Sequence, residues 1–441
     1  MSNRNIEVLP ANTLANGKVS FRNGNPVLRF EIGARDEYLI GSSVRLCGKF
    51  SAFKGVSASG VGEIPVDATK QFMSESTGVY SVIDSLSFAT HRTKQSIETI
   101  RNYNKMMATY LPVKTSKADG LTFLSNSALI TPNFESHRTA FVNNPKTLTG
   151  GNSFCLALTS GLLNSQEPIP LSDSWGLGGI ELTINLSPDA NVFYSENDSS
   201  ASFTDAFYEL SELSLVAETV IPDAPTLANL NASPSNTFEF NTISTFYQTI
   251  NSTNAVVNLN LGQSNVLGVF GSFVPVTFLN NMAQNGLLTS YPMNTDNRIA
   301  EIKSLIFNRA NERFPLHYNI DTPQKDDDRI EIAPADIVKN FLDSLDNFVN
   351  IQRTSVSPSN NRVLGFNASG LDYKKYADGG LTAGIGVCYD KISGNGVNFE
   401  NVPFTLQIES DLTTDNPNAL YLFVHARNTM VSSNGSVQIM N

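Results

Sequence analysis

The sequence predicts an all-β protein composed of two tandem β-sandwiches, and two observations support this fold class. Several segments alternate apolar and polar residues with a period of two, which is typical of strands with one buried face. The same order of elements then occurs in each half of the 441-residue chain. A chain of this length exceeds one typical hydrophobic core and is long enough for two domains.

The first half is expected to begin with two strands within residues 28–50 and to continue with four strands and one helix. The predicted order is strand 80–88, helix 93–110, a long loop, and strands 152–160, 180–187 and 208–220. The helix is inferred from an apolar stripe of Ile97, Ile100, Tyr103, Met107 and Tyr110. Pro112 is expected to end this helix.

The second half repeats that order. The predicted elements are strand 300–310, helix 334–350, a loop, and strands 383–391, 402–410 and 419–427. Pro334 suits the first turn of the helix, where its missing N–H is tolerated. The match concerns element order rather than residue identity, and a period of half the chain excludes solenoids and propellers.

The segment between the halves predicts a linker at residues 223–236, since prolines and small polar residues dominate it. It separates a first jelly roll, residues 1–222, from a second jelly roll, residues 237–441. A jelly roll is the expected form of each sandwich because its double-sheet wrapping protects edge strands. Each is expected to carry its helix in a long inter-strand connection.

A glycine-rich stretch, Trp175-Gly-Leu-Gly-Gly179, raises the question of a phosphate-binding loop. Such a loop requires a strand before it and a helix N-terminus after it. Here the alternating strand 180–187 follows the glycines, and Pro188 and Asp189 then end that strand. The glycines are therefore expected to bend the chain sharply beside Trp175.

Composition and charge limit the classes of function that the chain can have. The formal net charge is −11, and neither terminus carries a basic arm, which argues against nucleic-acid binding through a basic tail. Charged residues make up 16% of the chain, against about 25% in typical soluble domains. This depletion suggests large surfaces that are covered by partner subunits.

The N-terminal residues contain no apolar signal segment, so the protein is expected to stay in a reducing compartment. Cys47, Cys155 and Cys388 are three isolated cysteines in apolar surroundings. We expect them to be small buried hydrophobic residues rather than disulfide partners or nucleophiles.

No catalytic, cofactor-binding or metal-binding set is predicted, so the protein is not expected to be an enzyme. The histidines, His91, His137, His317 and His425, lack the spacing of a metal site. His425 is expected to point outward from a strand. Segments 325–329 and 390–398 are interpreted as turns because they lack the ligand pattern of a calcium loop.

Paired carboxylates for glycoside hydrolysis would have to come from Glu181, Glu409 or Asp411 on the predicted strands. This keeps a second hypothesis open, a two-domain β-sandwich protein that binds or hydrolyses carbohydrate. A third hypothesis, a viral spike or adhesin trimer, lacks the expected fibrous repeats.

The duplicated layout, the linker and the segment 169–193 together resemble the double jelly-roll major capsid proteins. The chain is most similar to those of polinton-like viruses and virophages, in the lineage of adenovirus hexon and the tailless icosahedral bacteriophages. The strand pair within residues 28–50 also fits this family.

This resemblance implies a structural subunit of an icosahedral DNA virus shell. It implies a homotrimer whose six sandwiches form a pseudo-hexameric capsomer, with neighbouring capsomers, penton proteins and minor or cement proteins as partners. Direct sequence-specific nucleic-acid binding and cofactors are not implied. The subunit would be assembled inside the host cell, would not be secreted, and would reside in the virion; the resemblance leaves open whether a membrane lies beneath the shell.

Overall fold

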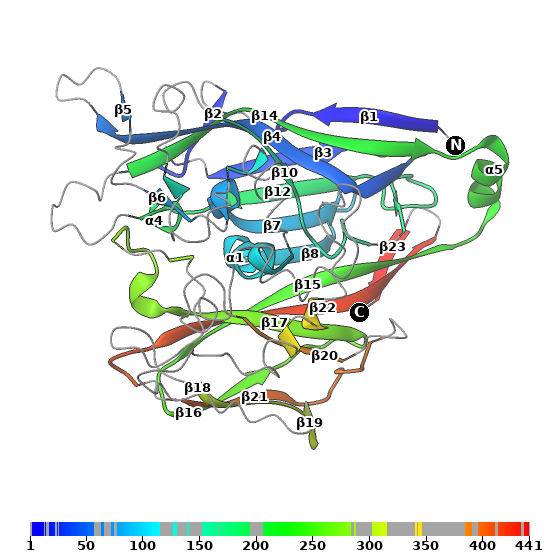
Figure 1. The fold of residues 1–441 in the computed structure, drawn as a ribbon. Helices are drawn as coiled ribbons and strands as arrows, with labels where there is room; N and C mark the ends of the chain where they lie inside the picture. The colour runs from blue at the N-terminus through cyan, green and yellow to red at the C-terminus, as the bar shows by residue number, and fades with distance from the viewer. Residues whose placement is uncertain are drawn as a thin grey trace.

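The computed structural model is built from antiparallel sheets stacked in two halves (Figure 1). It describes residues 2–12, 14, 17–22, 24, 26–56, 63–65, 72–74, 77–114, 127–129, 139–140, 152–165, 167–194, 206–283, 286–287, 302–314, 340–341, 343–345, 384–389, 396–410, 413–433 and 436–440.

Two large sheets form the first half. Sheet A has the order β1 (Ser2–Val8), β14 (Ala206–Ile221), β4 (Tyr38–Val56) and β10 (Asn152–Ala157). Sheet B has the order β3 (Val27–Ile32), β12 (Ile180–Leu186), β7 (Ile83–Thr90) and β8 (Ser96–Arg101). Short strands β2 (Lys18–Val19), β5 (Glu63–Pro65) and β11 (Ile169–Pro170) extend sheet A, and β13 (Phe193–Tyr194), β6 (Phe72–Met73) and β9 (Thr139–Ala140) form a small sheet C.

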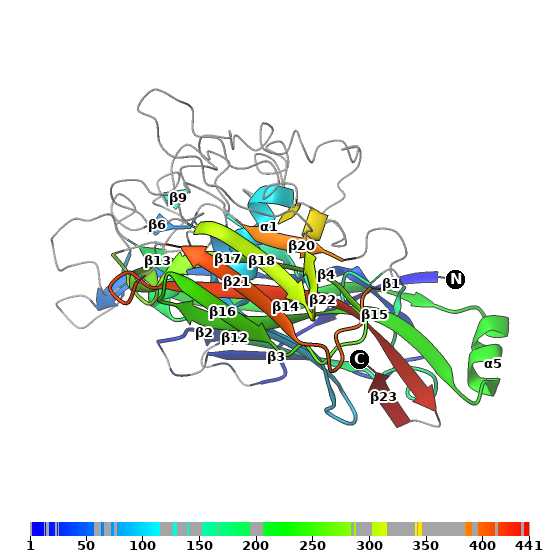
Figure 2. The same ribbon diagram turned by 90° about the horizontal axis from the view of Figure 1, so that it is seen from below.

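Two further sheets form the second half. Sheet D has the order β15 (Asn236–Ile250), β22 (Asn418–Ser433), β17 (Val266–Pro275) and β20 (Ile385–Cys388), with β23 (Ser436–Met440) paired to β22. Sheet E has the order β16 (Asn254–Leu259), β21 (Phe404–Ser410), β18 (Ile302–Arg309) and β19 (Glu312–Phe314). Figure 2 views the molecule from below, with strands of sheet E in front of those of sheet D.

The two halves have the same topology. Taking the eight main strands of each half in chain order, the first, eighth, third and sixth form one sheet, and the second, seventh, fourth and fifth form the other. All of these pairings are antiparallel. Eight strands wrapped into two sheets in this way are a jelly roll. The predicted all-β double jelly roll is therefore confirmed.

Most predicted strands lie close to their expected positions. Strand 180–187 is β12, whose residues alternate between buried and half-buried, and strand 402–410 is β21 with a similar alternation. The strand predicted at 80–88 starts later, since the 3-10 helix η1 (Gly78–Val82) precedes β7.

The helix predicted at 93–110 is wrong in its first half. Residues Ser96–Arg101 form β8, and the helix α1 spans Tyr103–Lys114, so it also continues past Pro112. A register shift places Glu98 opposite Phe88 and Ser96 opposite Ala89, so Ile97 has no partner in the ladder. Because of this bulge, Ile97 and Ile100 are both buried although they are three residues apart in the sequence. Buried residues at that spacing are also typical of one face of a helix, so the pattern imitates a helix.

Only part of the helix predicted at 334–350 lies within the described residues. Residues 340–341 and 343–344 are helical, and Phe341 and Leu345 are buried. The remainder of the segment lies outside the described part of the chain.

The predicted linker contains a helix, α5 (Ala224–Ala232). Asp223 caps it, because its carboxylate accepts a hydrogen bond from the backbone N–H of Thr226, and Pro225 occupies the first turn, where a missing N–H is tolerated. In Figure 1, α5 stands beside the N-terminus at one end of the stacked sheets. Among the described residues, no helix has both the length and the apolar character needed to cross a bilayer.

Candidate functional site

The junction between the two jelly rolls is the most extensively built feature of the structure. It centres on sheet D, where β17 and residues 418–426 of β22 are buried on both faces. In β22, Leu420, Leu422 and Val424 belong to the core of the second half, whereas Tyr421 and Phe423 belong to the core that extends into the first half. Alternation along a strand thus directs one set of side chains to each core.

The strand β17 divides its residues in the same way. Val269 and Phe273 point to the core of the second half, while Phe270 and Val274 join the core of the first half. All residues of β17 are buried. Sheet D is therefore an internal layer between the two cores, and the junction is a continuous apolar contact.

A buried carboxylate connects three segments at this junction. Glu98 on β8 is 3% exposed. Its Oε1 accepts hydrogen bonds from the backbone N–H groups of Gly161 (2.9 Å) and Ile243 (2.7 Å), and its Oε2 accepts one from Leu162 (3.1 Å). Burial raises the pKa of Glu98 to about 7, although these hydrogen bonds oppose the shift. Because Ile243 lies on β15, this side chain joins the first half to the second.

Close backbone approach accompanies these bonds. A Cβ added to Gly161 would lie 2.5 Å from the Cα of Thr242 on β15. Only glycine permits this contact without a shift of the backbone. Nearby, the hydroxyl of Thr245 donates to the carbonyl of Arg101 (2.9 Å) and accepts from its N–H (3.2 Å).

The helix α1 contributes a second polar link. The hydroxyl of Thr109 lies 2.9 Å from that of Ser272 on β17. Lys105 is buried, donates a hydrogen bond from its Nζ to the carbonyl of Gly286, and lies 5.9 Å from the ring centre of Tyr421. Burial lowers the pKa of Lys105 to about 7, against the opposing charge of Asp84.

His425 corrects a prediction from the sequence. It was expected to face outward, but it is 2% exposed, and burial lowers its pKa to about 4. The reason is the position of β22, which lies between β15 and β17 in sheet D and is buried on both faces over residues 418–426. The apolar run Ala419–Val424 is the sequence signal for such a doubly buried strand.

The glycine-rich stretch forms the sharp bend that was predicted. Gly178 and Gly179 have φ angles of +67° and +84°, and Trp175 is 1% exposed, with its ring centre 4.8 Å from that of Tyr38. The backbone N–H groups of residues 177–179 all donate to protein carbonyls. Because these donors are already used, the loop does not present the free N–H groups that a phosphate cradle needs.

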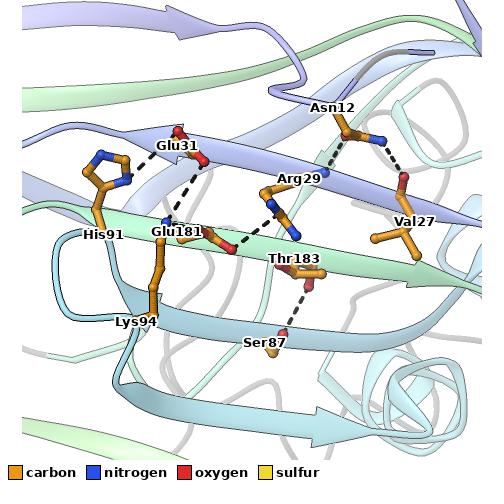
Figure 3. A network of polar contacts seen from close by, with 9 residues as sticks. All are labelled: Asn12, Val27, Arg29, Glu31, Ser87, His91, Lys94, Glu181 and Thr183. Carbon is orange, nitrogen blue, oxygen red and sulfur yellow. Dashed lines mark hydrogen bonds and ion pairs between the residues drawn. The ribbon is translucent and has the colours of Figure 1, made fainter.

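A polar network lies on sheet B, and Figure 3 shows it. Glu181 on β12 pairs with Lys94 and with Arg29, whose Nε lies 3.3 Å from the carboxylate. Glu31 on β3 lies 3.9 Å from both His91 and Lys94. Sequence analysis missed this convergence, because the turn after β7 brings His91 and Lys94 to strands distant in the chain.

One ligating atom from each of Glu31, His91 and Glu181 falls within 4.8 Å of the others, the arrangement of a small metal-binding set. Two cations, Lys94 and Arg29, already neutralise Glu181. A metal ion would have to displace Lys94, so the network functions better as a surface ion-pair cluster that ties β3, β12 and the β7–β8 turn together.

The other candidate residues are not brought together. Glu409 is exposed on β21 in sheet E, whereas Glu181 lies in sheet B of the other half. In segment 390–398 only residues 396–398 are described, and Gly396 has a φ of +72°. Asp411, His137, His317 and segment 325–329 lie outside the described residues.

The cysteines also depart from their prediction. All three are half-buried rather than buried. Cys47 and Cys155 are not isolated, since they are directly opposite on β4 and β10 and their sulfur atoms lie 3.0 Å apart. Residues separated by 108 positions in the sequence gave no signal of this contact.

Comparisons with protein-family models and with curated proteins find no match for this chain. Solved structures do match. The Faustovirus major capsid protein is similar with a TM-score of 0.57 and 8% identity, covering 98% of this chain and 90% of its own. A chain of the PBCV-1 virus capsid is similar with a TM-score of 0.55 and 11% identity, covering 99% and 96%.

A chain of the Sputnik virophage structure gives a TM-score of 0.52 and 11% identity, covering 99% of this chain and 88% of its own. These similarities span nearly the whole chain. The chain has the double jelly-roll fold of these viral capsid structures.

Proposed function

We propose that this chain is the major capsid protein of an icosahedral DNA virus and forms the repeating subunit of its shell. The observation that supports this function best is the duplicated jelly roll, which matches capsid chains over almost its full length. The role is structural, and residues 1–222 and 237–441 act as its two domains around the linker 223–236.

The junction gives this proposal a physical basis. Three copies of a chain with two similar lobes present six lobes around one axis, and such a trimer can tile a surface hexagonally if the lobes keep a fixed angle. The doubly buried sheet D and the hydrogen bonds of Glu98 hold the two lobes in one arrangement. Trimers would meet neighbouring capsomers, penton proteins and minor capsid proteins through their outer edges, within a virion assembled inside the host cell.

The carbohydrate hypothesis receives no support from the geometry. Glu181 is neutralised by Lys94 and Arg29, and Glu409 lies on a different sheet of the other half. Two catalytic carboxylates must lie within about 5–10 Å of each other across a shared cleft. A glycan-binding screen of the purified chain beside its Glu181→Ala and Glu409→Ala variants should therefore give no specific signal.

Native mass measurement tests the capsid proposal directly. The chain mass is 47.9 kDa, so a trimer would have about three times that mass, since heterologous contacts close into a ring. Electron microscopy of the particles from the native source should then show a shell of pseudo-hexameric units. A chain that stays monomeric at high concentration would contradict the proposal.

A further inference from the structure

Two cysteines face each other on sheet A, which contains the first and last main strands of the first half, β1 and β14. Cys47 on β4 and Cys155 on β10 are register partners, and their sulfur atoms lie 3.0 Å apart. Both side chains are half-buried, so a small reagent can reach them from solvent. In the described order β1-β14-β4-β10 of sheet A, β10 is one of the two edge strands and pairs with β4.

The backbone geometry suits a covalent link. Residues directly opposite in an antiparallel pair have Cα atoms about 4.5–5.5 Å apart, within the range of about 4.4–6.8 Å that disulfides span. Side-chain rotation alone can therefore bring the two sulfur atoms to bonding distance. Cys388 offers a contrast, because it lies on β20 in the second half, with its sulfur near the carbonyl of Leu267.

The local chemistry distinguishes the two thiols. Cys47 donates a hydrogen bond to the sulfur of Cys155, which stabilises the Cys155 thiolate and lowers the pKa of Cys155 to about 7. The same hydrogen bond raises the pKa of Cys47, and the positive charge of Arg45 acts to lower both values. Cys155 is thus the thiol that reacts first, since the thiolate is the nucleophile.

We propose that Cys47 and Cys155 form a reversible cross-strand disulfide when the protein meets a low-molecular-weight disulfide as oxidant. The Cys155 thiolate attacks one sulfur of the oxidant and releases its other half as a thiolate, which leaves a mixed disulfide on Cys155. Cys47 then gives up its proton and attacks the Cys155 sulfur, and the second half of the oxidant leaves. The oxidant gains two electrons and two protons and departs as two thiols, while the protein loses two hydrogen atoms.

The bond would fasten the edge strand β10 to β4 and close the chain segment between them. If the chain is a shell subunit, a point that rests on the proposed function, the thiols would stay reduced in the host cell and join after release into an oxidising medium. Disulfide formation itself is a property of the single chain and does not depend on assembly.

The test uses the purified full-length chain, equilibrated with mixtures of oxidised and reduced glutathione and then quenched with an alkylating agent. Peptide mapping without reduction should recover one cross-linked pair, Cys47 with Cys155. Alkylation of these two residues should fall by about tenfold or more relative to Cys388 in the oxidising mixture, and added dithiothreitol should restore it. The Cys388→Ser variant should behave like the wild type.

Cys155→Ser provides the matched variant. It should leave Cys47 open to alkylation in the same mixtures, because the attacking thiol, with which Cys47 would form the bond, is gone. Full alkylation of both Cys47 and Cys155 in the wild type under oxidising conditions would overturn the proposal. A cross-link that involves Cys388 or joins two chains in its place would do the same. A monomeric chain that still forms the Cys47–Cys155 bond would refute only the proposed function.

Discussion

Replacement of Glu98 by alanine should loosen the junction between the two jelly rolls. The change removes an acceptor that serves three buried N–H groups, those of Gly161, Leu162 and Ile243. Each buried donor left without a partner costs about 1–3 kcal/mol. Three such donors give an expected loss of about 3–9 kcal/mol in the free energy of unfolding under acidic conditions, where the carboxyl is neutral.

The stability loss caused by Glu98→Ala should depend on pH, and the raised pKa of Glu98 determines whether the loss grows or shrinks as the pH rises. Glu98 has a pKa of about 7 in the folded chain against a usual value of 4.5. The folded state therefore holds its proton more tightly, so the stability that this group contributes is fully present below pH 4.5 and decreases as the pH rises to about 7. One pKa unit corresponds to about 1.4 kcal/mol. The Glu98→Ala loss should consequently be about 2 kcal/mol larger at pH 5 than at pH 8.

Urea denaturation at a fixed protein concentration measures this effect. The chain has one tryptophan, and Trp175 is buried in the first half, so its fluorescence reports that half while far-UV circular dichroism reports both. Glu31→Ala is the matched control, since Glu31 is a third exposed and its ion pairs are long, at 3.9 Å. Its effect should stay within about 0.5 kcal/mol at either pH. A Glu98→Ala loss no greater than that of Glu31→Ala would refute the assigned role of this carboxylate.

Two further stability predictions concern the same junction. Gly161→Ala should destabilise the chain by about 1–3 kcal/mol, because its new Cβ would lie 2.5 Å from the backbone of β15. Gly33→Ala is the control and should be nearly neutral in the same urea experiment, since a Cβ there meets nothing within 4 Å. Equal effects of the two substitutions would contradict the close approach. His425 has a pKa lowered to about 4 by burial, so the stability that its neutral form contributes should fall by up to about 3 kcal/mol as the pH decreases from 6.5 to 4. Because Glu98 acts in the opposite direction over this range, the effect is measured as the change with pH in the stability difference between the wild type and a His425→Asn variant, and a difference that does not change with pH would contradict it.

Sequence pattern predicted the sheets well wherever one face of a strand is buried and the other is not. The predicted alternation of β12 and β21 agrees with their burial in the structure, because the outer faces of these strands meet solvent or polar side chains. The prediction failed at β8, where a bulge at Ile97 interrupts the period of two and the resulting spacing imitates a helix. A local shift of one residue in the ladder leaves no separate mark in the sequence, since it depends on the partner strand.

The junction itself was only partly predictable. A strand that is buried on both faces has a nearly continuous run of apolar residues, and this signal lies within the strand's own sequence. The run Ala419–Val424 and the fully buried β17 both carry it. Glu98 carries no such signal, because a glutamate on a strand normally faces water. Its burial is tolerated only because three N–H groups from two distant segments converge on it, and that convergence exists only after both halves have folded.

The composition of the chain fits two different kinds of contact, those within the chain and those proposed between subunits. Within the chain, sheet D uses apolar side chains on both faces, so the lobes are joined by the interaction that is least sensitive to salt. Buried polar groups there, among them Glu98, Lys105 and Thr109, add directional contacts that fix the angle between the lobes. The proposed shell function would require this rigidity inside each subunit, because an error in the lobe angle would be repeated at every lattice contact. Under the same proposal, the low charge content, 16% of residues, is expected to reflect surfaces outside the junction that subunits cover in one another.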